Sequence, residues 1–304
     1  VWNPDLSQLT SASIVTATGQ IFFTLSLGMG IICNYASYLQ PDEDIVTASV
    51  ATVALNEFAE VILAGTSVIP ISYAFLGPEG IKGSIGLAFM ALPNVFTTMA
   101  GGRIFGAVWF FLLFFAGFTS AIAMYNYLVA LLEEELGVQR KKGALLIFVL
   151  YLIVGAPIAA EGIITGEANL IYFTEVDNWI GNYLLIVLGL LEVITLAWLV
   201  RDDGLVEMNK GGLWHVPKWF YKLFHQFLTP ICIIVFLGIF TRDYWIAGNF
   251  KITPSYINGI EYMAPWVNAA RLVVVVVLII GFIQTHRAIK RKYKDEIETN
   301  KANA

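Results

Sequence analysis

Residues 19–30 read Gly-Gln-Ile-Phe-Phe-Thr-Leu-Ser-Leu-Gly-Met-Gly and lie within an apolar segment at about 14–38. At about 1.5 Å per residue, a helix of that length crosses a bilayer. Its middle is unusual, because Thr24 and Ser26 are polar and the two glycines flanking Met29 each cost about 1 kcal/mol relative to alanine in a helix. Such an interruption predicts a broken helix with a site for a small solute or ion near the midplane. The alternative is that the glycines only allow close helix packing.

The composition is that of a polytopic membrane protein. Of 304 residues, 58% are hydrophobic and 13% are charged, against about 25% charged in a soluble domain. Cys33 and Cys232 both fall in apolar segments, so no disulfide framework is indicated. No nucleophile is paired with a base, which argues against an enzyme, and we expect no nucleic-acid partner.

The whole chain, residues 1–304, is predicted to be a single all-α transmembrane domain in the lipid bilayer. Seven segments approach the roughly 20 apolar residues that a span requires; they lie at about 14–38, 45–70, 106–132, 143–160, 180–200, 219–240 and 265–283. The connector 71–105 is too interrupted by proline and glycine to span. Its short apolar piece, 85–91, predicts a helical re-entrant segment, and we interpret the connector as an external lid-like loop.

The distribution of lysine and arginine predicts the orientation of the chain. Of the 18 such residues, 13 fall in the loops on one side, four fall on the other side, and Arg271 lies just inside the last span. The rule places the basic tail, 286–304, and the C-terminus in the cytoplasm and the start of the chain outside. We therefore expect a multi-pass protein of the plasma (inner) membrane.

The first span carries candidate ligand-binding residues. Phe23 and Ser26 are three residues apart and share a helix face. Ser26 offers a hydroxyl to the polar end of a ligand, while Phe23 and Met29 offer apolar walls. Ordinary core packing is the alternative for each residue taken singly.

The second span carries Asn56 and Glu60 at i and i+4. A carboxylate within a span is expensive to bury and is a functional candidate by default. The alternative for Glu60 is a protonated acid in a structural hydrogen bond. Glu57 lies off this face and remains unassigned.

The third span places the Ala116 carbonyl and the hydroxyls of Thr119 and Ser120 on one surface. Three close, uncharged oxygens suit a hard cation. Serine and threonine in spans also bond back to their own helix, and this is the alternative for an isolated pair.

Three further residues stand out in or beside the fourth and fifth spans. Glu192 is a second intramembrane acid. Asp177, near the outer end of the fifth span, is either a solvated charge or a gate. Pro157 is expected to end the fourth span.

Three motifs in this order resemble the neurotransmitter:sodium symporter family, which has the LeuT-type inverted-repeat fold. They are the segment 19–30, Leu-Asn-Glu-Phe-Ala-Glu-Val-Ile-Leu at 55–63, and Phe-Phe-Ala-Gly-Phe-Thr-Ser at 114–120. The likeness continues through Leu-Glu-Glu-Glu-Leu at 132–136 and Asn-Lys-Gly-Gly at 209–212. It implies helices six to twelve of twelve, meaning the second repeat and two C-terminal helices, with five N-terminal helices missing from this chain.

The resemblance implies sodium-coupled uptake of an amino acid, with two sodium sites. Thr24 and Asn56 would serve one sodium site, and Ala116, Thr119 and Ser120 the other. The residues that would line the substrate pocket are Phe23, Thr24, Ser26, Met29, Ser120 and Met124, and those at the outer gate are Gln20 and Asp177. Met29 stands where other members often carry phenylalanine.

Glu60 stands where chloride-dependent members of that family have a small hydroxyl residue. The resemblance therefore implies a bacterial member in which this carboxylate supplies the negative charge and chloride is not required.

The sequence thus favours a sodium-coupled symporter for an amino acid, with an apolar or aromatic substrate, working by alternating access around the broken helix 19–30. The rival interpretation is a non-transporting, half-length membrane protein that binds amino acids as a sensor or a partner subunit.

Overall fold

The structure is a computed structural model that describes residues 7, 9–77, 87–166, 170–257 and 263–294. All regular elements in these ranges are helical, which confirms the predicted all-α class. Six helices are long and apolar enough to cross a membrane by length and composition. The first predicted span is not among them, because α1 (Ser11–Thr24) and α2 (Ile31–Ala36) are separated by a six-residue break.

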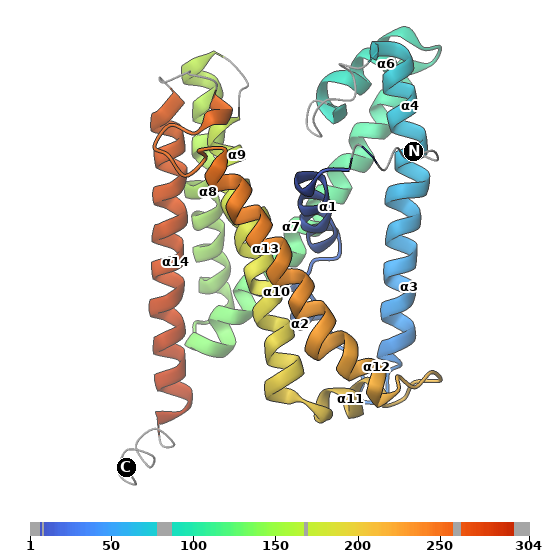
Figure 1. Ribbon diagram of the computed structural model, residues 1–304. Helices are drawn as coiled ribbons and strands as arrows, with labels where there is room; N and C mark the ends of the chain where they lie inside the picture. The colour runs from blue at the N-terminus through green and yellow to red at the C-terminus, as the bar shows by residue number, and fades with distance from the viewer. Residues whose placement is uncertain (1–6, 8, 78–86, 167–169, 258–262, 295–304) are drawn as a thin grey trace. The chain divides into compact units, whose positions relative to one another are not determined.

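Two compact units make up the chain, and each is described by itself. The first comprises residues 1–9, 40–123 and 206–216. Its elements are α3 (Ile45–Glu57), η2 (Phe58–Ala64), α4 (Gly65–Leu76), η4 (Leu87–Ala91), α6 (Leu92–Thr98) and most of α7 (Gly102–Leu136). The elements α3, η2 and α4 run on as one long helix with a π-helical middle, drawn in blue in Figure 1.

Most of the described part of the lid-like connector is helical. Elements η4 and α6 cover residues 87–98 and pack together and against α4. Residues 78–86, which include the first two positions of the predicted re-entrant piece 85–91, lie outside the described residues.

Asp44 begins α3 as its N-cap. Its carboxylate accepts hydrogen bonds from the Thr47 N–H at 3.0 Å, the Thr47 hydroxyl at 2.7 Å and the Leu213 N–H at 3.2 Å. These donors, first of all the Thr47 backbone, hold the pKa of Asp44 below its ordinary value. The cap therefore stays ionised at neutral pH and also attaches the 206–216 loop to the start of α3.

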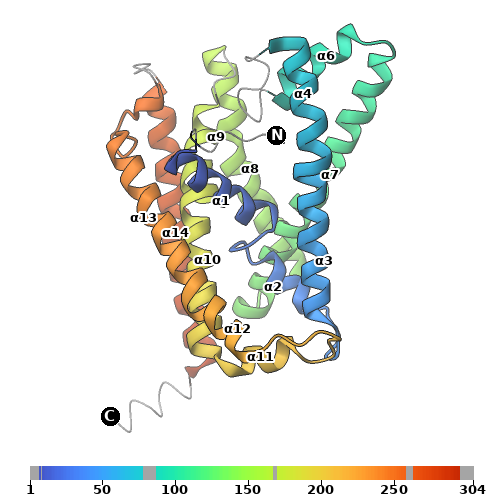
Figure 2. The same cartoon turned by 45° about the vertical axis from the view of Figure 1, so that its right-hand side comes forward.

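The second unit comprises residues 10–39, 124–205 and 217–304. It contains α1, α2 and the end of α7, followed by the elements α8 (Arg140–Thr165), α9 (Ile171–Val176), η5 (Asp177–Leu184), α10 (Leu185–Ile194), η6 (Thr195–Val200), α11 (Asp202–Met208, which begins here), α12 (Lys218–Tyr221), η7 (Lys222–Leu228), α13 (Thr229–Ile246), η8 (Ser255–Ile257) and α14 (Ala264–Lys292). Figure 2 shows α10 and α13 running side by side, and they are in direct contact.

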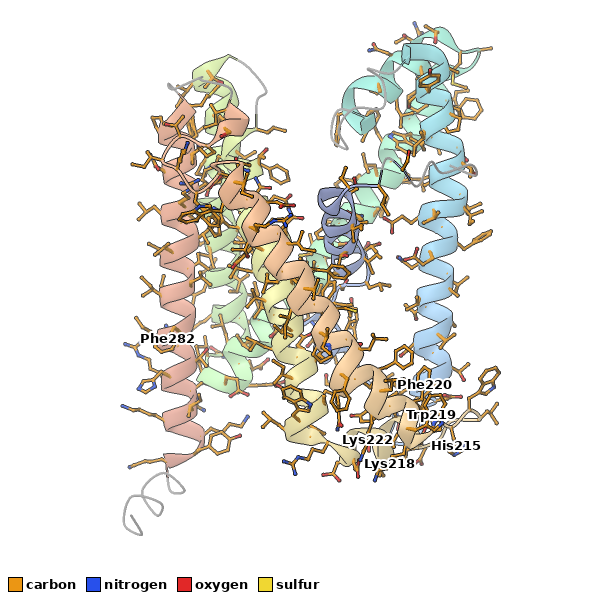
Figure 3. The ribbon with its side chains drawn as sticks, in the orientation of Figure 1. His215, Lys218, Trp219, Phe220, Lys222 and Phe282 are labelled. Carbon is orange, nitrogen blue, oxygen red and sulfur yellow. The ribbon has the colours of Figure 1, made fainter. Side chains whose placement is uncertain are left out.

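A small buried core lies where α14 packs against α9. Ile257, Met263 and Val267 are at most 1% exposed there. Along most of the long helices the apolar side chains face outward instead, as Phe282 does on α14 (Figure 3). Outward apolar surface of this extent is expected of helices that contact lipid.

The helix that corresponds to the fifth predicted span begins at Ile171, nine residues before the predicted start at 180. Residues 171–179 read as a loop because they include a glutamate, an aspartate and an asparagine. The buried carboxylate of Glu161 accepts the N–H groups of Ile171 and Tyr172 at 2.7 and 2.8 Å and so caps this helix. The helix is long because its polar residues find partners in the fold.

Glu175 and Arg271 form an ion pair between α9 and α14. The Glu175 side chain is completely buried, and its Oε1 lies 2.5 Å from Arg271 Nε. Trp179 Nε1 also donates to Glu175 Oε1 at 2.8 Å. The guanidinium donates its remaining hydrogen bonds to the carbonyls of Lys251 and Asn249, both at 2.7 Å.

Two prolines do not end their helices. Pro157 lies inside α8, which continues to Thr165, so the expectation that it ends the fourth span is wrong. Pro70 lies inside α4, which continues to Leu76, beyond the predicted end of the second span at 70. Proline removes one backbone hydrogen bond, and helices in membranes absorb that loss through local adjustments such as π-helical turns.

The other long helices extend past their predicted ends. They run over 102–136, 140–165, 218–246 and 264–292, against predictions of 106–132, 143–160, 219–240 and 265–283. Polar and charged residues carry these helices beyond the apolar stretches, so residues 286–292 of the predicted basic tail are helical. Residues 295–304 of that tail lie outside the described residues.

Candidate functional site

The break between α1 and α2 is closed by local hydrogen bonds. The Leu25 N–H donates to the Ile21 carbonyl at 3.1 Å, and the Leu27 N–H donates to the Phe22 carbonyl at 2.9 Å. Ser26 has a φ of 56°, in the left-handed region that L-residues seldom adopt. The helix therefore ends where the sequence predicts an interruption, and a polar residue in an uncommon conformation sits at its centre.

Gly28 attaches the break to α10. Its φ of 72° is left-handed, and a Cβ added there would lie 2.8 Å from the Leu185 carbonyl oxygen. Its N–H donates to Glu192 Oε2 at 3.2 Å. The intramembrane acid Glu192 therefore satisfies a backbone donor that the break has freed from helical pairing.

Gly30 attaches the break to α7. Its φ is also 72°, and a Cβ there would lie 2.2 Å from the Tyr127 ring. An alanine would fit only if the Tyr127 ring moved away. Gly28 and Gly30 are thus required both for their backbone conformation and for close approach. The two interpretations of the sequence, a broken helix and close helix packing, therefore both apply.

Most predicted substrate residues of the second unit lie in this break or next to it along the chain. Phe23, on the last turn of α1, is 49% exposed. Thr24, Ser26 and Met29 are half-buried, and Met124 is half-buried on α7. Ser120 lies one helical turn before Met124 on α7, in the first unit.

The predicted sodium ligands fall in both units. Thr24 ends α1 in the second unit, and Asn56 lies in the last turn of α3 in the first. Ala116, Thr119 and Ser120 are exposed on consecutive turns of α7.

The Thr119 hydroxyl bonds back to its own helix. It donates to the carbonyls of Phe115 at 2.9 Å and Ala116 at 3.2 Å. This is the geometry of the structural alternative, but a donated hydroxyl keeps its lone pairs and can still ligate a cation. The donated hydrogen bond therefore orients the Thr119 hydroxyl and leaves its oxygen able to coordinate a cation.

Glu60 lies in the π-helical segment η2, one helical turn after Asn56. Both residues are half-buried. A π-helical turn inside an α-helix is frequent at functional sites, because it changes the face on which side chains emerge.

The predicted gate residues come from α1 and η5, which pack together. The Asp177 carboxylate accepts a hydrogen bond from Asn182 Nδ2 at 3.3 Å, and a Cβ on Gly19 would lie 3.3 Å from Asn182 Oδ1. Gln20 is exposed and follows Gly19 directly. Asp177 lies in the second turn of the long helix that begins at Ile171, near the end of the span at which the sequence places it.

Sequence reasoning missed Tyr127 and Asn182 and left Glu192 without a role. The spacing of Tyr127 contained a signal, because positions 116, 120, 124 and 127 recur at intervals of three and four along one face of α7. Asn182 had no such signal, since its role depends on the packing of α1 against η5.

A helix broken at mid-span, set among long apolar helices and held by an intramembrane acid, is the arrangement of secondary transporters. The chain belongs to the sodium:neurotransmitter symporter family, whose sequence profile matches residues 1–290.

Three relatives illustrate this membership. The chain is 33% identical over 264 residues to an uncharacterized sodium-dependent transporter of Methanocaldococcus jannaschii, covering 82% of the chain and 51% of the relative. It is 31% identical to an uncharacterized sodium-dependent transporter of Bacillus subtilis, covering 78% and 53%. It is 24% identical to sodium-dependent nutrient amino acid transporter 1 of Drosophila virilis, covering 83% and 39%. The chain spans about half the length of the two prokaryotic relatives.

Proposed function

We propose that this chain supplies helices six to twelve of a sodium-coupled symporter that imports an apolar or aromatic amino acid through the plasma membrane, with its C-terminus in the cytoplasm. The observation that carries the proposal is the break at 25–30, where Gly28 and Gly30 seat an uncoiled backbone between Glu192 on α10 and Tyr127 on α7. Family membership and the names of the relatives support sodium dependence.

In this proposal the break between α1 and α2 binds the amino-acid substrate. Uncoiled backbone presents carbonyls and N–H groups to the polar end of an amino acid, since each helix end leaves backbone groups without helical partners. Phe23 and Met29 contact the substrate side chain. By resemblance to the family, Thr24 and Asn56 would serve one sodium ion and Ala116, Thr119 and Ser120 the other, through uncharged oxygens. Gln20 and Asp177 close the outer side.

The test of the proposed function is uptake into proteoliposomes. With the complete symporter reconstituted, including the helices that precede this chain in the proposal, an inward sodium gradient should drive labelled leucine or phenylalanine uptake several-fold above an equal potassium gradient. The ionophore gramicidin, which collapses the sodium gradient, is the control. Amino-acid binding without uptake would reject the symporter and support the sensor or partner subunit.

Glu60 should make transport independent of chloride. A fixed carboxylate near a bound cation offsets its charge, and removing it leaves a deficit that an external anion can fill. We expect Glu60→Ser to lower uptake about tenfold when gluconate replaces chloride, equivalent to about 1.4 kcal/mol, and chloride to restore most of it.

The matched control for that experiment is Glu57→Ser, because Glu57 is a half-buried glutamate of the same helix with no proposed role. It should transport equally in both anions. If Glu60→Ser also transports equally in both, Glu60 is a structural acid and the charge argument is wrong.

A further inference from the structure

A groove of about 470 Å³ lies in the second unit, away from the broken helix. It is formed where the end of η6 meets the first turns of η7, and its lining includes Trp198, Leu199, Arg201, Asp203, Lys222 and Gln226. The long helix 171–200 ends here and the long helix 218–246 begins here. The groove therefore lies at a single membrane surface. Figure 3 shows Lys218 and Lys222 together at this end of α12 and η7.

The walls of the groove are fixed by hydrogen bonds. The hydroxyl of Tyr221, a fully buried residue, donates to the Arg201 carbonyl at 3.1 Å. Gln226 Nε2 donates to the Ala197 carbonyl at 3.1 Å. Arg201 has a φ of 55°, which ends the helix abruptly, and its Nε donates to the Trp198 carbonyl at 3.0 Å. This hydrogen bond fixes the Arg201 side chain and leaves its two terminal nitrogens to face a ligand.

Some charged groups of the groove already have an ion-pair partner, and others have none in the part of the chain that the structure describes. Asp202 Oδ2 lies 2.5 Å from Lys218 Nζ, so this carboxylate is neutralised, and Lys218 holds the pKa of Asp202 below its ordinary value. Among the described residues, Arg201, Lys222 and Asp203 form no ion pair. Lys222 also lowers the pKa of Asp202, but without an ion pair, so two cations and one carboxylate can bind a ligand without breaking an ion pair.

This pattern matches a zwitterion at a lipid surface. A phosphodiester carries one negative charge and several acceptor oxygens, which suit a guanidinium and an ammonium together. A primary ammonium donates hydrogen bonds, which suits Asp203. Leu199 is 75% exposed and Trp198 is 49% exposed beside these charges, as expected where acyl chains and headgroups meet. Basic pockets between helix ends at a membrane surface are known to take phospholipid headgroups.

We propose that this groove binds an aminophospholipid of the ethanolamine type, with its phosphodiester between Arg201 and Lys222 and its ammonium on Asp203. The lipid would join the end of η6 to the start of η7. These two segments already touch through the Gln226–Ala197 hydrogen bond, and the bound lipid would add a second connection at this corner of the unit.

The experiment is native mass spectrometry of the purified protein in detergent, titrated with dioleoyl phosphatidylethanolamine, phosphatidylglycerol or phosphatidylcholine. The wild type should bind phosphatidylethanolamine most tightly, because the glycerol headgroup has no ammonium and the choline ammonium has no N–H. Lys222→Gln should weaken all three lipids about fivefold, since a basic residue near a membrane surface contributes about 1 kcal/mol. Asp203→Asn should weaken phosphatidylethanolamine alone and abolish its preference.

The matched control is Lys142→Gln, which removes an exposed lysine from the first turn of α8 and should change none of the affinities. Lys222→Arg keeps the charge and should bind as the wild type does, which separates lost binding from lost folding. Equal wild-type affinity for the three lipids would overturn the proposal, as would unchanged affinity in Lys222→Gln.

Discussion

Replacing Arg271 by methionine is expected to lower the free energy of unfolding by about 3–5 kcal/mol, because Glu175 would remain fully buried without its cation. The carbonyls of Lys251 and Asn249 would also lose their donors. Thermal unfolding in detergent should show this as a fall in Tm of roughly 10 °C.

The control for Arg271→Met is Lys292→Met. Lys292 also joins α14 to another helix, through Glu135 at 2.9 Å, but its side chain is 54% exposed and that of Glu135 is 32% exposed. Ion pairs of this exposure contribute little to stability because water and salt screen them, so Tm should hardly change. The double variant Glu175→Gln with Arg271→Met should recover part of the loss, since it leaves no unpaired charge. If Arg271→Met and Lys292→Met had the same Tm, the buried pair of Glu175 and Arg271 would not be stabilising.

The second large effect is expected at the proposed sodium site on α7. Thr119→Val keeps the shape of the side chain and removes one oxygen. Losing an interaction between a neutral oxygen and a charge costs about 1.5–3 kcal/mol, so sodium affinity should fall about 10- to 100-fold. The measurement is the sodium dependence of labelled amino-acid binding to the purified complete symporter.

A threonine of the same local geometry serves as the control for Thr119→Val. The Thr52 hydroxyl donates to the Ala48 carbonyl at 2.8 Å on α3, just as the Thr119 hydroxyl donates to that of Phe115. Thr52→Val should therefore leave sodium affinity unchanged. Wild-type sodium affinity in Thr119→Val would mean that its hydroxyl serves only the helix, and the site would have to be placed elsewhere.

The long helices of this chain could be predicted with six of the seven spans in place, because hydropathy over about 20 residues depends only on local composition. Their ends could not. Residues 171–179 are helical because Glu161 caps them and Arg271 pairs with Glu175, and both partners come from elsewhere in the sequence. Pro70 and Pro157 were expected to mark boundaries, yet the helices pass through them.

By itself the sequence determined the membrane class, the interruption at 19–30 and the family resemblance, since all three are written in neighbouring residues. Only the tertiary structure decided which residues contact the interrupted segment. Gly28 meets Glu192 across 164 positions and Gly30 meets the Tyr127 ring, and no local pattern encodes such pairs. A backbone freed from its helix must find partners for its polar groups wherever the fold supplies them, so the partners of the broken helix emerge only when the helices pack.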